Sequence, residues 1–91
     1  MNVAANRDAQ RIIEEFLPDR DLADRFRQQL IKTFSYILQH PGGFQIRYQN
    51  YRYAPLDVFK YHVIYSYRGK MITVHRIRHM RQEQIRRYSG R

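Results

Sequence analysis

The chain has 91 residues and no cysteine, so one hydrophobic core must hold it together without disulfides or thiolate metal sites. No apolar run reaches the roughly 20 residues of a membrane span, and we expect a cytoplasmic protein without membrane association. The formal net charge of +9 favours anionic partners.

Two helices are predicted in the first half of the chain, after a short strand at Val3–Ala5. From Ala9 the apolar residues follow helical spacing, with Asn6 as N-cap and Pro18 as the stop. A second helix follows Asp21 as its cap and ends near residues 40–43. Its apolar stripe consists of Leu22, Phe26, Leu30, Phe34, Ile37 and Leu38.

Three antiparallel strands are predicted after Gly43, where the apolar period changes from helical to two. We place them at Phe44–Ala54, Val58–Tyr67 and Met71–His79, with Arg68-Gly69 as a tight turn between the last two. One face of this sheet would lie beneath the helices and the other would stay open. The expected fold is a single α+β domain over residues 1–91, with 82–91 as a flexible or helical tail.

The last two strands place a set of histidines on the predicted open face. With Arg68-Gly69 as the turn, Tyr65 pairs with Ile72 and Val63 with Val74 on the buried side. Alternation then sets His62 opposite His75 on the open side and sends three later residues there: Ile77, His79 and Arg81. A bulge near Arg76 or Ile77 would invert every later side chain.

Four of these residues form a candidate catalytic set: His62, His75, His79 and Arg81. RNA cleavage through the 2′-hydroxyl needs a proton acceptor, a proton donor and a cation for the charge on phosphorus, which imidazoles and guanidinium supply. The same residues would also simply neutralise phosphate or an acidic partner. No metal is expected, because no carboxylate lies nearby in the sequence, and no nucleotide cofactor is expected, because no nucleotide-binding glycine loop appears.

The positive charge belongs to the later part of the chain. Residues 1–24 carry a net −3, whereas residues 25–91 contain 14 Lys or Arg against two carboxylates. Seven of the eight tyrosines lie between residues 48 and 88, and aromatic rings between cations suit stacking on bases, although tyrosine is equally a common strand residue. The candidate residues for nucleic-acid or partner binding are Arg47, Arg52, Tyr53, Lys60, Arg78, Arg86, Arg87 and Tyr88.

Two segments resemble the C-terminal hairpin of the RelE/ParE toxin family. Phe59-Lys60-Tyr61-His62-Val63-Ile64-Tyr65 is similar to its aromatic-rich strand, and Ile72-Thr73-Val74-His75-Arg76-Ile77-Arg78-His79-Met80-Arg81 is similar to its last strand with a basic end. The helix opening at Asp8-Ala9, then Ala23 and Phe26, and Pro41 before the strands agree with the family, over about residues 3 to 81.

The resemblance implies a toxin of a type II toxin–antitoxin system, neutralised by a cognate antitoxin. RelE-like members cut messenger RNA on the ribosome, whereas ParE-like members inhibit DNA gyrase without being nucleases. By position, Arg81 matches the arginine that RelE-like members use on the scissile phosphate, and Arg52 and Tyr88 fall near other basic and tyrosine positions. His62 departs from the pattern, since RelE-like nucleases usually have arginine there. The alternative is a non-toxic basic nucleic-acid-binding or adaptor module of the same fold.

Overall fold

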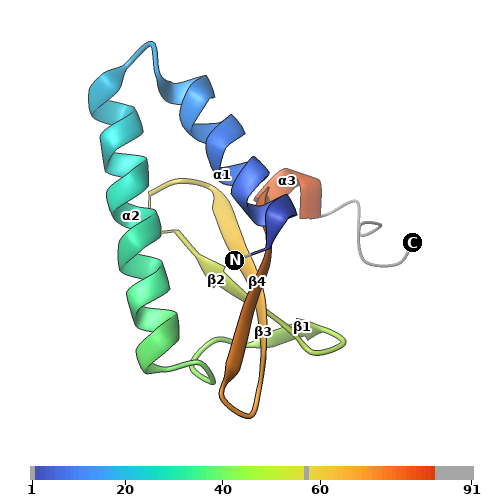
Figure 1. The fold of residues 1–91 in the computed structure, drawn as a ribbon. Coiled ribbons are helices and arrows are strands. Elements are labelled where there is room, and N and C mark those ends of the chain that lie inside the picture. Colours follow the sequence, from blue (N-terminus) through green and yellow to red (C-terminus); the bar gives the residue numbers. More distant parts are fainter. Residues whose placement is uncertain (1, 57, 84–91) are drawn as a thin grey trace.

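The computed structural model describes residues 2–56 and 58–83, and the α+β class is confirmed. In chain order the elements are α1 (Val3–Phe16), α2 (Arg20–Gln39), β1 (Ile46–Tyr48), β2 (Tyr51–Pro55), β3 (Tyr61–Arg68), β4 (Met71–His79) and α3 (Met80–Glu83). The four strands form one antiparallel sheet in the order β1-β2-β3-β4. Figure 1 shows α1 and α2 as an antiparallel hairpin, with α1 beside β4.

The predicted strand at Val3–Ala5 is wrong, because this segment is the first turn of α1. Asn2, not Asn6, is the N-cap, and its side-chain oxygen accepts a hydrogen bond from the Ala5 backbone N–H at 2.9 Å. Two alanines also favour helix over strand. α2 is capped in the same way by Asp19, two residues earlier than expected, through the Leu22 N–H at 3.1 Å.

The predicted strand at Phe44–Ala54 is a hairpin, so the sheet has four strands where three were expected. Its turn, Gln49-Asn50, lies between the paired residues Tyr48 and Tyr51. The turn escaped prediction because it lacks a glycine: Gln49 itself has φ +50°, a left-handed conformation that non-glycine residues seldom adopt.

The core lies between the helices and one face of the sheet. Phe26 of α2 is completely buried, and its ring contacts those of Phe16 and Phe59 at centroid distances of 5.5 and 5.3 Å. The predicted buried face is confirmed: Val63, Tyr65 and Val74 belong to this core and Ile72 packs against it. Among the described residues, no helix combines the length and hydropathy needed to cross a bilayer.

The turn between β3 and β4 is Gly69-Lys70, not Arg68-Gly69. Arg68 pairs with Met71, and Tyr65 therefore pairs with Val74 where Ile72 was expected. Gly69 has φ +60°. A two-residue hairpin turn needs a positive φ at its first position, which glycine adopts without strain and arginine does not.

Candidate functional site

A β-bulge at His75 decides which side chains share a face of the sheet. Ile64 pairs with Arg76 and the next residue, Tyr65, pairs with Val74, so His75 is the extra residue of β4. Beyond it the alternation inverts: Ile77 is completely buried in the core, and His79 pairs with Tyr61 on the helix side. The predictions that His62 pairs with His75, and that Ile77 and His79 share their face, are wrong.

The face away from the helices is built from three rows across β2, β3 and β4. Pro55, His62 and Arg78 form one row, and Tyr53 and Ile64 form the next, in which Arg76 pairs with Ile64 while its side chain bonds to Asp8 of α1. The third row contains Tyr51, Ser66 and His75, which are joined by side-chain contacts. We call these three rows the outer face. Its expected openness is wrong at the centre, where Tyr53, His62 and Ile64 are all buried.

His75 is held by both of its row neighbours. Its Nε2 lies 2.8 Å from the Ser66 hydroxyl oxygen, and the Tyr51 ring meets the imidazole edge-on at a centroid distance of 5.0 Å. Burial lowers the pKa of His75 below its ordinary value, because the charged imidazolium is the form that loses solvation. The imidazole is therefore a neutral hydrogen-bonding group at pH 7.

His62 is packed within the outer face. Only 9% of the residue is exposed, and its ring lies 5.6 Å from that of Tyr53 in an edge-on arrangement. The guanidinium of Arg47 lies over the same tyrosine ring, 4.8 Å from its centroid. The Tyr53 ring of β2 thus contacts both Arg47 of β1 and His62 of β3.

His79 ends β4 on the opposite face of the sheet from His62, and Arg81 follows on α3. The His79 ring contacts Tyr61 at 5.0 Å, and its Nδ1 accepts a hydrogen bond from the Arg81 backbone N–H at 3.1 Å. Arg81 is exposed on α3. The four residues predicted for catalysis are therefore not brought together, and their catalytic role stays a prediction. Nor do any three His, Asp or Glu side chains of the described segments converge to hold a metal.

Asp8 is a buried carboxylate that the sequence reasoning did not single out. It accepts hydrogen bonds from Arg76 Nε at 2.8 Å, from Arg76 Nη2 at 3.1 Å and from the Ile77 backbone N–H at 2.9 Å, with Arg11 at 3.4 Å. We call Asp8, Arg76 and Ile77 the Asp8 network. A signal existed, because Asp8 lies between Ala5 and Ile12 on the apolar stripe of α1.

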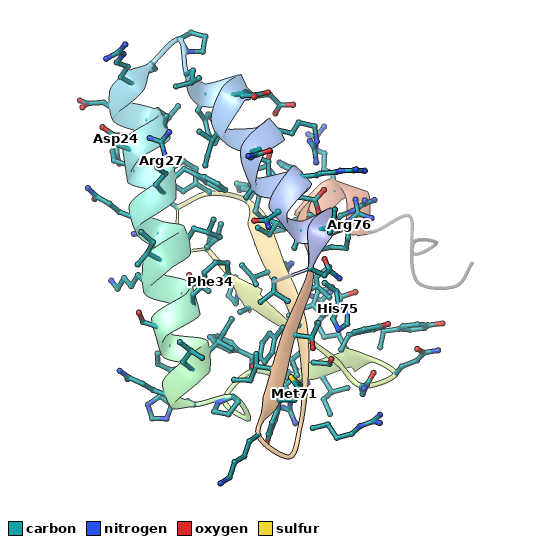
Figure 2. The ribbon with its side chains drawn as sticks, viewed as in Figure 1. Asp24, Arg27, Phe34, Met71, His75 and Arg76 are labelled. Carbon is teal, nitrogen blue, oxygen red and sulfur yellow. The ribbon has the colours of Figure 1, made fainter. Side chains whose placement is uncertain are left out.

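The Asp8 network joins α1 to the bulge and orients Arg76. Burial alone would raise the pKa of Asp8, but the hydrogen bonds from Arg76 and Ile77 and the arginine charge outweigh it and lower the pKa below its ordinary value. Figure 2 shows Arg76 on β4 beside α1, with His75 next to it on the strand. Of the two bulge residues, Arg76 therefore stabilises the fold through its bonds to Asp8.

The candidate binding residues divide into exposed and structural ones. Arg47 and Lys60 are exposed, whereas Tyr53 is buried and Arg78 is partly buried opposite His62. Arg52 is structural: its Nη1 donates to the Phe44 carbonyl at 2.6 Å, and its guanidinium lies 5.2 Å from the Tyr67 ring centroid. Arg86, Arg87 and Tyr88 lie outside the described residues.

Comparison with known proteins gives one family. Residues 1–84 match the family described as the ParE toxin of the type II toxin-antitoxin system, parDE. Neither the search of curated proteins nor that of solved structures found a match. The matched segment covers the three helices and four strands described above, including the Asp8 network and the outer face. The chain therefore belongs to the ParE toxin family and is the toxin component of a type II toxin–antitoxin system.

Proposed function

We propose that this toxin stops growth by binding to DNA gyrase, without cutting RNA, and that a cognate antitoxin neutralises it. The β-bulge at His75 carries the proposal. It directs His79 toward Tyr61 on the helix side, whereas His75 is bonded to Ser66 and His62 is packed against Tyr53. Acid–base cleavage needs a donor and an acceptor that reach one phosphodiester, and these imidazoles face different surroundings.

Membership of the ParE toxin family also supports gyrase as the target. ParE-like members of the RelE/ParE group act on gyrase, and the match is to the ParE toxin. His62, where RelE-like nucleases usually have arginine, is 9% exposed and cannot serve as a surface cation in their manner. Inhibition by binding requires a complementary surface and no chemical step, which a rigid basic sheet provides.

Two assays on the purified full chain test the proposal. Gyrase supercoiling of relaxed plasmid should be inhibited by the toxin and restored when its antitoxin is added first. A translating extract with a labelled message should show intact message at the same toxin concentration. Cleaved message, suppressed by Arg81→Ala or His79→Ala, would contradict the proposal and select ribosome-associated mRNA cleavage.

A growth experiment separates toxin activity from the alternative of a non-toxic basic module. Expression of this gene alone should arrest bacterial growth, and co-expression of the neighbouring antitoxin gene should restore it. Normal growth despite abundant folded protein would contradict the growth-inhibiting role. Asp24→Ala is a suitable neutral variant, because Asp24 is an exposed α2 residue whose carboxylate pairs with Arg27 of the same helix.

A further inference from the structure

The β1–β2 hairpin is the most exposed part of the described sheet. All six residues from Gln45 to Asn50 are exposed, and β1 is the edge strand. Figure 1 shows the hairpin extending away from α2, beyond the strands that the helices cover. We call residues 45–50 the hairpin arm. An arm of this kind presents its side chains to a partner from both sides of a two-stranded ribbon.

The side chains of the hairpin arm are amides, a cation, an aromatic ring and an aliphatic group. Gln45, Gln49 and Asn50 carry amides, Arg47 carries the guanidinium, and 42% of Tyr48 is exposed. The sequence contains no Asp or Glu between Asp24 and Asp57, so no carboxylate of this segment opposes the charge. Glutamine and asparagine read adenine edges and arginine reads guanine or grips phosphate, which makes this a composition typical of nucleic-acid readers.

The arm has a rigid base. Arg52 donates to the Phe44 carbonyl at 2.6 Å, and the Tyr53 N–H donates to the Gln45 carbonyl at 3.4 Å. Tyr51, the first residue after the turn, packs against His75 of the bulge. A fixed ribbon loses little conformational entropy when it enters a groove, so these contacts favour binding by the arm as a unit.

Two further cations lie at the same end of the sheet. Arg52 pairs with Tyr65 and Arg68 pairs with Met71, so the β1–β2 turn and the β3–β4 turn lie at the same end. Arg68 and Lys70 are exposed there. Figure 1 shows the loop between α1 and α2, whose last residue Asp19 caps α2, at the opposite end of the molecule. Arg68 and Lys70 therefore add positive charge at the end of the sheet from which the arm extends.

We propose that the hairpin arm binds B-form duplex DNA by entering the major groove, with Arg47, Arg68 and Lys70 on the phosphates. This inference rests on the proposed function, because gyrase holds duplex DNA and a toxin that touches both would bind the complex. The major groove, about 12 Å wide, admits a two-stranded ribbon, whereas the deep and narrow major groove of A-form RNA does not. Binding of single strands by stacking on successive bases is disfavoured, since Tyr51 and Tyr53 are already engaged by His75 and Arg47, which leaves Tyr48 as the exposed ring of the arm.

The test is fluorescence anisotropy of the full chain with a labelled mixed-sequence DNA duplex of about 20 base pairs, in the absence of gyrase, over a series of salt concentrations. Three phosphate contacts predict a slope of about −3 for log K against log salt. A duplex RNA of the same sequence is the comparison probe. We expect the DNA duplex to bind at least tenfold more tightly.

Three variants locate the contact. Arg47→Gln should weaken binding about three- to tenfold, and Arg68→Ala with Lys70→Ala should reduce the salt slope by about two. Gln49→Gly keeps the charge and suits the left-handed backbone, so a loss of affinity there reports the arm itself. Arg27→Gln is the matched charge control, because Arg27 is exposed on α2, across the molecule from the arm (Figure 2).

The binding results of these variants either support or overturn the proposal. Loss of affinity in the arm variants and not in Arg27→Gln supports the proposal. It is overturned if DNA does not bind at 100 mM salt, if Arg27→Gln weakens binding as much as Arg47→Gln, or if RNA binds equally well. Supercoiling assays on the same preparations keep the two proposals apart: inhibited gyrase without DNA binding removes only the DNA inference, and DNA binding without inhibition removes only the gyrase proposal.

Discussion

The Asp8 network and the hairpin arm show two opposite uses of arginine in one small sheet. Arg76 is turned toward α1, where a buried carboxylate accepts two of its hydrogen bonds, and it holds the last strand to the first helix. Arg47 stays exposed and lies over Tyr53, at the edge of the sheet where no helix covers it. The comparison teaches that charge alone does not identify a binding surface, because burial and a partner turn a cation into part of the fold.

The largest expected effect comes from removing the carboxylate of the Asp8 network. Asp8→Ala leaves the Arg76 charge uncompensated and the buried Ile77 N–H without its acceptor. We expect a loss of about 3 kcal/mol in the free energy of unfolding, measured by urea denaturation. Asp24→Ala, which breaks an exposed pair, should cost less than about 0.5 kcal/mol. Equal costs for the two variants would show that the network is not a buried anchor.

The same carboxylate predicts a pH dependence. Because the pKa of Asp8 is lower in the folded chain than in the unfolded chain, its contribution is complete above the unfolded value of about 3.9 and is lost as the pH falls through the folded pKa. The difference in stability between the unmodified protein and Asp8→Asn should therefore shrink as the pH is lowered from 7 toward 2. A difference that stays constant over this range would contradict the assignment.

A substitution at the base of the hairpin arm should destabilise the protein less than the loss of the Asp8 carboxylate. Arg52→Ala removes the hydrogen bond to the Phe44 carbonyl and the contact with Tyr67, both at partly exposed positions. We expect a loss of about 1 to 2 kcal/mol, with faster amide hydrogen exchange in β1 and β2 than in β3. Uniform exchange across the whole sheet would show that Arg52 supports more than the arm.

The smallest expected change in the free energy of unfolding is an increase, and it comes from Gln49→Gly. Gln49→Gly relieves a left-handed non-glycine residue at the turn and should stabilise the protein by about 0.5 kcal/mol, because the relief exceeds the added entropy of the unfolded chain. Thermal denaturation would measure it. A destabilised variant would mean that the Gln49 side chain contributes contacts to the folded arm. In the double variant with Asp8→Ala, the two changes in the free energy of unfolding should add if the Asp8 network and the hairpin arm are independent.

The helices and most of the sheet followed from local signals. Amphipathic spacing, Pro18, the Pro41-Gly42-Gly43 segment and the strand Met71–His79 were correctly interpreted, since these depend on residues close together in the chain. The prediction of a strand at Val3–Ala5 was wrong because Asn2 caps a helix that begins at these residues. The β1–β2 turn was not predicted because Gln49 adopts a left-handed conformation that is usual for glycine and that the residue type does not indicate.

The site was harder to predict than the fold, and one residue explains why. The bulge at His75 is favoured by long-range contacts, namely the Asp8 carboxylate on the Ile77 N–H and the Ser66 hydroxyl on the imidazole, which no local pattern contains. Since strand faces alternate, a single extra residue moved His79 and Ile77 to the helix side. Arg47 and Lys60 are exposed in the structure, and their part in binding stays a prediction.

The Asp8 network also has a consequence for synthesis of the protein. Its donor and acceptor residues lie 68 and 69 positions apart, and α1 leaves the ribosome long before β4 has been made. Until Ile77 emerges, α1 has no strand edge to close against, and loop closure over that distance makes completion a late, non-local event. A nascent toxin therefore lacks its finished sheet during most of its translation.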